Sequence, residues 1–367
     1  MCCNTSDLSL IDCMDRGVRS AEKDRVSTCP LADRIADACI KKYQELRGTD
    51  EAINQGVLAG IVLTIDDTDL HVLSIAMGNK FQNTAKSSSD ATKVRDCHAE
   101  VLVRRAFKFW LFTEWSRMHK NPSYFSQIFS LTPDARLILK SGVKIFLYVS
   151  SAPCGNACIR RWGQAQKEVF DSSLGSLQLP ESSHGVFHAH AKKEGQTAIT
   201  FKGQSDTLSC SDKILKWNTL GLQGTRLRSL VQDKLVLDGI VVGRKFVSVH
   251  AQRAFCCRFA SKNVSKRIRD EVHHPALMCS AVKFDTGTFN ASDGEGAVFD
   301  SRSFWWADGK HEEIDGYSGV QVDGSISALS SHSFEERSKS LGIQGPSQDA
   351  LELDNLVKLE LNNLYST

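Results

Sequence analysis

A histidine and a glutamate separated by one residue, His98 and Glu100, have the clearest chemical potential in this sequence. A Pro-Cys step follows at Pro153-Cys154, and a further cysteine stands at Cys210. One histidine and two cysteines can hold a catalytic zinc ion, which takes three protein ligands and leaves a fourth position for water. Bound zinc lowers the pKa of its water toward neutrality, and a nearby glutamate can move protons. The pattern predicts a hydrolytic zinc centre.

Each motif is weak when taken alone, because buried glutamates, histidines and free cysteines also occur in ordinary protein cores. Their joint occurrence favours a zinc centre over ordinary core packing, because each motif stands where a zinc centre needs it. His98 and Glu100 open an expected helix, and Cys154 lies at a strand-to-helix junction. Spacing leaves the third ligand open. The usual Pro-Cys-x-x-Cys pattern would place it at Ala157, so Cys158 and Cys210 both remain candidates.

Composition is that of an ordinary globular protein. The 367 residues are 41% hydrophobic and 24% charged, and the net charge of +2 leaves room only for a local nucleic-acid-binding patch. The longest apolar runs, such as Val57–Ile65, are too short to span a membrane. The amino terminus has no export-signal pattern, so we expect the 12 cysteines to be reduced thiols. We therefore expect an intracellular protein, in the cytoplasm, the nucleus or both.

Hydrophobic periodicity predicts strands alternating with helices. A β-hairpin is expected over Gly56–Ile65 and His71–Met77, and a third strand over Val143–Ser150. The remaining expected strand is Lys234–Val242, and Trp305-Trp306 is expected in the core. The expected helices are Leu31–Leu46, Asp96–Met118, Asn156–Gln164, Ser211–Leu230, Val249–Arg258, Ser333–Leu341 and Asp349–Leu364.

This order of elements predicts one three-layer α/β/α domain with a mixed central sheet and a helical extension at the carboxyl end. We place the domain at residues 29–367, after a flexible tail over 1–28, with an insertion at about 170–206. His273-His274 and the histidines at 184, 188 and 190 could suggest a second metal site. Their irregular spacing in a loop argues against it, and the sequence alone does not predict one.

One block of the sequence resembles the core block of the RNA adenosine deaminases. It runs from Cys210 to Ile214 (Cys-Ser-Asp-Lys-Ile) and continues through Lys216-Trp217-Asn218 to Gly221–Gly224. The matching blocks are Val57–Thr64, Asp96–Glu100 with Arg104-Arg105, and Ser150–Gly155, within a resemblance that covers roughly residues 30–345. It implies a cytidine-deaminase-like zinc domain. In that family the cysteine of the core block is the third zinc ligand. The resemblance therefore implies the ligands His98, Cys154 and Cys210, with Glu100 as the catalytic residue.

The family also buries inositol hexakisphosphate inside the domain. The resemblance implies contacts to it from the following residues: Arg104, Arg105, Lys213, Lys216 and Thr225. The residues themselves support an anion, because Arg104 lies on a helix that is otherwise rich in apolar residues. The alternative to a bound anion is that these cationic side chains pair with carboxylates of the protein. The family's carboxyl-terminal part of this pocket looks shortened here, with only Lys358 and Tyr365 able to belong to it.

The substrate implied by the resemblance is tRNA, and in particular the adenosine 3′ of the anticodon of alanine tRNA. Only some 55 residues precede the first expected strand, so we expect no separate double-stranded-RNA-binding domain. The segment Gly203–Asp206 also resembles the tRNA branch, and Asn79 and Lys80 match positions near the target nucleotide. Two alternatives stand: an editor of other RNA that a partner protein recruits, and a catalytically impaired RNA-binding member.

Overall fold

The computed structural model describes residues 29–47, 56–81, 90–158, 208–260, 264–284 and 302–366. The predicted tail at 1–28 and the predicted insertion at 170–206 lie outside the described residues. Within the described part, no helix is both long enough and apolar enough to cross a membrane.

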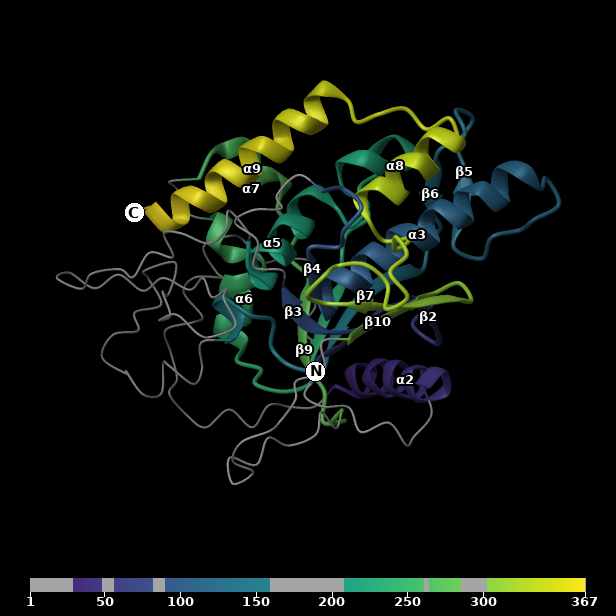
Figure 1. The fold of residues 1–367 in the computed structure, drawn as a ribbon. Coiled ribbons are helices and arrows are strands. Elements are labelled where there is room, and N and C mark those ends of the chain that lie inside the picture. Colours follow the sequence, from purple (N-terminus) through teal and green to yellow (C-terminus); the bar gives the residue numbers. More distant parts are fainter. Residues whose placement is uncertain are drawn as a thin grey trace, which may run out of the picture.

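A mixed sheet of seven strands forms the centre of the fold, in the order β11-β10-β2-β1-β7-β8-β9 (Figure 1). The strands β7, β8 and β9 run parallel to one another, whereas all other neighbours in the sheet are antiparallel. The strands are β1 (Leu58–Ile65), β2 (Asp69–Met77), β7 (Val143–Val149), β8 (Gly239–Val242), β9 (Ala276–Cys279), β10 (Arg302–Ala307) and β11 (Lys310–Asp315). Two small hairpins, β3–β4 (Asn79–Phe81, Asp96–His98) and β5–β6 (Phe129–Leu131, Leu137–Leu139), accompany it.

Both faces of the sheet are covered, because strand side chains alternate between the two faces. On β1, Leu58 and Val62 belong to the core beneath helix α2 (Pro30–Arg47). Ile61 and Leu63 belong to the larger core beneath helix α3 (Ala99–Lys120). Figure 1 shows α2 on one side of the sheet and α3 on the other. The predicted mixed α/β fold with a central mixed sheet is confirmed.

Close packing of α2 on the sheet depends on a glycine. A Cβ atom added at Gly60 would lie 2.3 Å from Sγ of Cys39, which is buried on α2. Only a residue without a side chain allows this approach.

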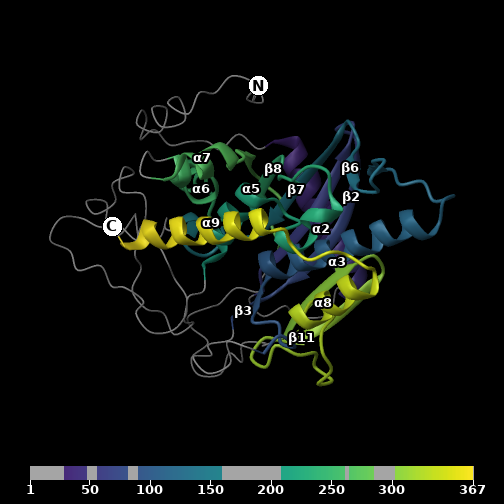
Figure 2. The same ribbon diagram turned by 90° about the horizontal axis from the view of Figure 1, so that it is seen from above.

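The remaining helices extend the α3 side of the molecule. Helix α5 (Cys210–Leu220) contacts α3, α6 (Ser248–Phe255) and α7 (Lys266–Glu271). Figure 2 shows the carboxyl-terminal helix α9 (Gln348–Ser366) running across α5, and the two helices are in contact. Helix α8 (Ser331–Ser340) covers part of α3, with Phe334 stacked on Phe112. The described part of the chain also contains the short 3-10 helices η1 (Asn156–Cys158), η3 (Thr225–Leu230) and η4 (Cys257–Ala260).

The structure corrects two predicted helices near the site. Asp96–His98 is a strand paired with Asn79–Phe81, so the helix begins at Ala99 and not at Asp96. The helix predicted over Ser211–Leu230 is broken after Leu220. The cause is that Gly221 and Gly224 have φ of 87° and 67°, left-handed values that a helix cannot contain.

Two other predictions differ mainly in length, and a third is only partly tested. The strand predicted over Lys234–Val242 includes only Gly239–Val242, and the helix over Val249–Arg258 divides into α6 and η4 at Cys256. The helix predicted over Asn156–Gln164 is described only as η1, and its remainder lies outside the described residues.

Candidate metal centre

Strand pairing positions the histidine of the predicted centre. In the β3–β4 hairpin Asn79 pairs with His98 and Lys80 pairs with Cys97. His98 keeps an extended backbone (φ −64°, ψ 142°) and is the N-cap of α3. Glu100 then lies in the first turn of that helix with its side chain buried. The hairpin thus fixes His98 at the end of the helix that carries Glu100, and it places Asn79 and Lys80 beside the centre through their backbones.

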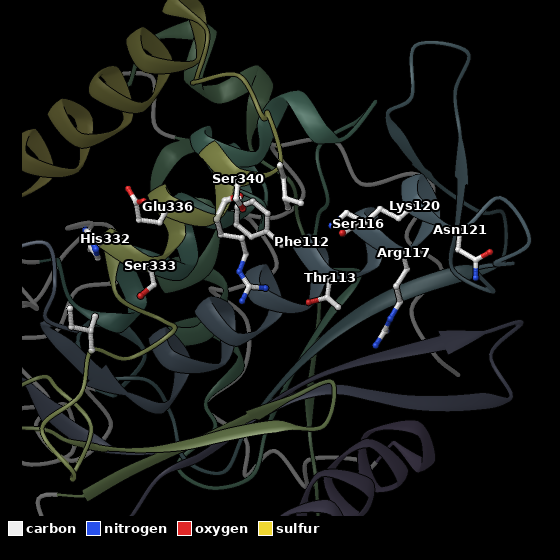
Figure 3. Close-up of a pocket in the computed structure, with 13 residues that line it drawn as sticks. Phe112, Thr113, Ser116, Arg117, Lys120, Asn121, His332, Ser333, Glu336 and Ser340 are labelled. Atoms are coloured by element: carbon white, nitrogen blue, oxygen red, sulfur yellow. The ribbon is translucent and has the colours of Figure 1, made fainter.

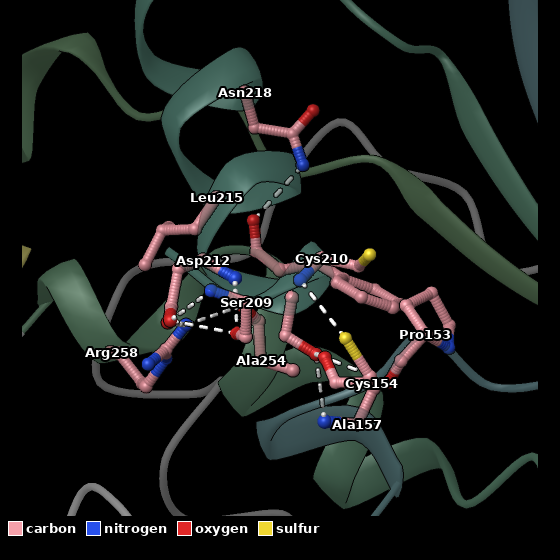
Figure 4. A network of polar contacts seen from close by, with 12 residues as sticks. Pro153, Cys154, Ala157, Ser209, Cys210, Asp212, Leu215, Asn218, Ala254 and Arg258 are labelled. Atoms are coloured by element: carbon pink, nitrogen blue, oxygen red, sulfur yellow. Dashed lines mark hydrogen bonds and ion pairs between the residues drawn. The ribbon is translucent and has the colours of Figure 1, made fainter. Parts of the chain in front are cut away.

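Two backbone segments bring the cysteines together (Figure 4). Cys154 follows β7, and its carbonyl oxygen accepts hydrogen bonds from the backbone N–H of Ser211 at 3.0 Å and from the Ser211 hydroxyl at 2.8 Å. The Ser211 hydroxyl also accepts a bond from the N–H of Ala157 at 3.1 Å. The backbone N–H of Cys210 donates to Sγ of Cys154 at 3.3 Å. The Pro-Cys turn is therefore fastened to the amino end of α5.

The amino end of α5 is itself held by a capping box. Ser209 and Asp212 exchange side-chain-to-backbone hydrogen bonds, each at 3.2 Å. Asp212 also forms a fully buried ion pair with Arg258 at 2.7 Å. Since Cys210 is the first residue of α5, these contacts fix its position.

The structure confirms that the three predicted donors meet. The ligand atoms of His98, Cys154 and Cys210 all lie within 4.8 Å of one another. This set fits a catalytic zinc ion, which commonly takes three protein ligands of the nitrogen and thiolate type. The side chain of the alternative ligand Cys158 lies outside the described residues.

Asp96 orients the histidine. One carboxylate oxygen lies 2.7 Å from Nδ1 of His98, and the other accepts an ion pair from Nζ of Lys213. Burial would raise the pKa of Asp96, but the charges of Lys213 and His98 outweigh it and hold that pKa below its ordinary value. The carboxylate is therefore ionised, and its contact with Nδ1 fixes the orientation of the His98 ring. A carboxylate behind a ligating histidine is a common feature of zinc sites.

The surroundings also favour proton transfer and metal binding. Burial raises the pKa of Glu100, although the charge of His98 partly opposes the shift. A carboxyl group with a raised pKa can both accept and deliver protons near neutral pH. The hydrogen bond between the two thiols lowers the pKa of Cys154 and raises that of Cys210, so in the metal-free protein it favours a single thiolate, on Cys154.

A basic cavity of about 280 Å³ lies on the other side of Asp96. Six cationic side chains line it, and they come from α3, α5 and η3: Arg104, Arg105, Lys108, Lys213, Lys216 and Arg226. Lys213 thus belongs both to the cavity and to the ion pair with Asp96. Four of the five residues predicted to bind inositol hexakisphosphate line this cavity. Thr225 begins η3 but is not among the residues around the cavity, whereas its neighbour Arg226 is.

The cations of the cavity are only partly compensated by the residues described. Lys216 pairs with Asp354 of α9 at 2.6 Å, and Arg105 donates to the carbonyl of Leu329 at 2.7 Å. Arg104 lies over the ring of Trp217, and its buried Nε has no hydrogen-bond partner among the described residues. Gly224 approaches the end of the Arg104 side chain, since a Cβ atom there would lie 2.6 Å from Nη2, and its φ of 67° favours glycine at this position. The cavity is therefore suited to a compact polyanion.

A larger pocket of about 950 Å³ lies at the other end of α3, between that helix and α8 (Figure 3). Phe112, Thr113, Arg117 and Lys120 line it from α3, and Ser333 and Glu336 line it from α8. It includes neither Glu100 nor any of the three metal donors. Its size therefore does not mark it as the reaction site.

Sequence reasoning missed three functional residues. Lys108 follows Arg104 by one helical turn, so the i, i+4 spacing could have placed both on the same face. Asp96 precedes His98 by two residues, the separation of alternate side chains on a strand, but the sequence pattern places both residues on the predicted helix over Asp96–Met118. Arg226 carries no signal of its own, because it joins the cavity only through the break at Gly221–Gly224.

The mixed sheet, the His-Cys-Cys cluster and the buried glutamate beside it define a deaminase-type zinc domain. A family model described as the adenosine-deaminase (editase) domain matches residues 74–340, and the chain belongs to this family.

Several curated proteins are similar to the chain. The double-stranded RNA-specific adenosine deaminase of Mus musculus is 30% identical over 82% of this chain, and the aligned part is 26% of that protein. The double-stranded RNA-specific editase Adar of Drosophila melanogaster is 29% identical over 62% of this chain and 35% of the editase. The tRNA-specific adenosine deaminase 1 of Drosophila melanogaster is 27% identical over 58% of this chain and 55% of that enzyme. The chain therefore spans only a quarter to about half of these relatives.

Proposed function

We propose that this protein deaminates adenosine to inosine in RNA by zinc-dependent hydrolysis. The convergence of His98, Cys154 and Cys210 beside the buried Glu100 carries the proposal. A zinc ion held by these three residues supplies an activated water nucleophile at neutral pH. The reaction adds water at C6 of the adenine and releases ammonia.

The protein side chains have distinct tasks in this reaction. Asp96 fixes the orientation of the His98 ring through Nδ1. Glu100 takes a proton from the nucleophilic water and delivers it to the purine nitrogen and the departing amine. Because Glu100 is buried, solvent water does not compete for these transfers. Asn79 and Lys80 lie beside His98 in the hairpin and are proposed to contact the target nucleotide.

For the basic cavity we propose inositol hexakisphosphate as the occupant. Six cationic groups around about 280 Å³, with the buried Nε of Arg104 among them, need the charge of several phosphates. Arg104, Arg105, Lys108, Lys213, Lys216 and Arg226 would provide the contacts. The occupant would be a structural cofactor rather than a reactant, since none of these side chains belongs to the metal cluster.

For the substrate we propose tRNA, with the adenosine 3′ of the anticodon of alanine tRNA as the target. The resemblance of Gly203–Asp206 to the tRNA branch supports this choice. Double-stranded RNA is the second candidate, because the double-stranded RNA-specific relatives named above are 29–30% identical and the tRNA-specific one 27%. An intracellular location, in the cytoplasm or the nucleus, is part of the proposal.

The decisive experiment measures inosine formation and zinc content for the purified wild-type chain and for Glu100→Gln. We expect zinc in both proteins and inosine from the wild type only. Parallel reactions on alanine tRNA and on a long RNA duplex distinguish the two substrates. A folded protein that contains zinc but forms no inosine on either RNA would contradict the proposed function.

A further inference from the structure

A second group of metal-type donors lies outside the catalytic centre. The ligand atoms of Cys256, Cys257 and His274 also lie within 4.8 Å of one another. The two sulfur atoms are 3.4 Å apart, and Sγ of Cys257 is 3.9 Å from Nδ1 of His274. Cys256 is buried, Cys257 is half-buried and His274 is exposed, so an ion could enter from solvent. We propose that these three residues bind a second metal ion of the zinc class.

The separations agree with those of a zinc site. In a tetrahedral site with Zn–S of about 2.3 Å and Zn–N of about 2.0–2.1 Å, two sulfur ligands are about 3.8 Å apart and a sulfur and a nitrogen about 3.6 Å apart. The observed separations lie within about 0.4 Å of these values. Two thiolates and an imidazole are also the ligand types that select zinc over the oxygen-preferring calcium and magnesium.

Local backbone geometry explains why two neighbouring cysteines face the same point. Helix α6 ends at Phe255, and Cys256 leaves the helical conformation with φ −148° and ψ −54°. Cys257 then begins η4. This break brings both sulfur atoms to one side of the chain. The Cys256 thiol donates to the Gln252 carbonyl at 3.2 Å, a contact that metal binding as the thiolate would replace.

One residue of α5 brings the cysteine pair and the histidine together. The side-chain amide of Asn218 donates to the carbonyl of Phe255 at 2.9 Å (Figure 4), directly before Cys256. Its backbone carbonyl accepts from the N–H of His273 at 2.8 Å, directly before His274. Both donor segments are therefore held by the same buried residue, one by its side chain and the other by its backbone, before any ion binds. Preorganisation of this kind lowers the cost of binding.

The alternative is a redox pair, since adjacent cysteines can form a disulfide. The two sulfur atoms are well beyond the S–S bonding distance of about 2.05 Å, so the two cysteines form no disulfide. A redox pair also gives no reason for the exposed imidazole beside them. Three convergent donors favour a metal, with the fourth position of the tetrahedron taken by water or by another side chain.

The test measures zinc per chain in the full-length protein, purified under reducing conditions and dialysed against metal-free buffer. We expect two zinc ions in the wild type and one in the double variant Cys257→Ser/His274→Ala. The double variant Cys279→Ser/His311→Ala is the matched control. It removes a half-buried free cysteine and an exposed histidine outside both clusters, and should keep two ions. His98→Ala should lose the other ion, which separates the second site from the catalytic one.

One zinc ion in the wild type, lost in His98→Ala and unchanged in the Cys257 variant, would overturn the proposal. A disulfide between Cys256 and Cys257 in the purified protein, with no second zinc after reduction, would also overturn it. If the double variant does not fold, His274→Ala alone is informative because its side chain is exposed. A chelator should then extract the second zinc at least tenfold more readily than from the wild type, and equal extraction would contradict the site.

Discussion

Asp96 links the metal centre to the basic cavity through a single carboxylate. One oxygen holds Nδ1 of His98, and the other receives the ammonium group of Lys213, which lines the cavity. The tautomer and the ring orientation of His98 therefore depend on a charge that is shared between two functions. A carboxylate that hydrogen-bonds to the second nitrogen of a metal-bound histidine raises the basicity of the imidazole and fixes its orientation.

Replacing that carboxylate should weaken zinc binding. Asp96→Asn keeps the shape of the side chain but removes the charge that faces His98. We expect the zinc affinity to fall about 10- to 100-fold, measured by competition with a chromophoric chelator. Asp90→Asn is the control, because Asp90 is half-buried, ionised and close in sequence but contacts Thr92 and Lys93. Equal affinities for Asp96→Asn and the wild type would show that Asp96 does not support the ligand.

Glu100 should be required for chemistry but not for metal binding. Glu100→Gln is expected to lower the rate of inosine formation at least 10²-fold, because an amide cannot shuttle protons. The zinc content should be unchanged, and single-turnover assays with metal analysis measure both. Glu114→Gln is a matched control, since Glu114 is also buried on α3 but bonds to Tyr124 and Ser126 far from the donors. Similar losses in the two variants would point to a structural effect.

For single residues, the sequence predicted the groups of the metal centre better than the charged residues around it. His98, Cys154 and Glu100 were identifiable because a catalytic zinc centre restricts the residue types that can serve it. Spacing left Cys158 and Cys210 both open as the third ligand, and only the family resemblance selected Cys210. Lys108 and Arg226 were not, because a cationic side chain on an expected helix or loop is usually solvated. Their function follows from which elements enclose them, and that is a property of the tertiary structure.

Helix α5 is the element on which the functional groups depend. It begins with the predicted ligand Cys210, continues with Lys213 and Lys216 in the cavity, and carries Asn218, which bonds to the segment of the second donor cluster. The amino end of this helix is fixed by the capping box and by the buried pair between Asp212 and Arg258. A small displacement of α5 would therefore disturb several sites together.

Removing the guanidinium group of the buried Arg258–Asp212 pair should destabilise the folded protein. Arg258→Met leaves the buried carboxylate of Asp212 without its partner, so the free energy of unfolding should fall by about 3–5 kcal/mol. Arg117→Met is the control, because the Arg117–Asp308 pair at 2.8 Å is partly exposed. That variant should lose about 1 kcal/mol or less. Urea unfolding of the full-length chain measures both, and equal losses would mean that the buried pair does not anchor α5.

The sequence predicted best the elements whose hydrophobic pattern is not interrupted by turn residues. α2 and the β1–β2 hairpin were predicted nearly at their observed bounds. The burial of α2 follows the helical period, and the two strands are apolar runs separated by the polar turn at 66–69. The end of α5 was wrong by ten residues, although Gly221 and Gly224 stood within the predicted helix. Apolar residues such as Leu222, Leu227 and Leu230 maintain a helix-like pattern there, and they are buried through a turn and a 3-10 helix instead.

For the whole molecule, the basic cavity is the place where distant parts of the chain meet. Its walls come from α3, α5, η3 and α8, while α9 reaches Lys216 through Asp354. Clustered cations repel one another, so the domain without an anion stores unfavourable charge in its interior. An anion in the cavity would join elements that are separated by more than 200 residues in the sequence. The order of the elements could not reveal this, because no single segment contains the cavity.

Inositol hexakisphosphate should therefore stabilise the folded domain as a whole. Its addition is expected to raise the Tm of the wild type, because a ligand that binds only the folded state shifts the unfolding equilibrium. The variant Arg104→Gln/Lys108→Gln should show little shift. Lys339→Gln should respond like the wild type, since Lys339 is exposed on α8 and pairs with Glu335 and Glu336. An equal shift in all three proteins would mean that the anion binds elsewhere.

Proton uptake provides a second, independent readout of this site. Burial and the nearby charges of Arg104, Arg105 and Arg226 hold the pKa of Lys108 well below its ordinary value in the anion-free protein. A bound polyanion favours the ammonium form and raises that pKa again, so binding takes up a proton at any pH between the two pKa values. Across that range the affinity must weaken as the pH rises, because fewer free proteins carry the proton that the complex needs. Calorimetric titration in buffers of different ionisation enthalpy measures the uptake directly. Lys108→Gln should lose most of the proton uptake, and a full uptake in that variant would assign the proton to another group.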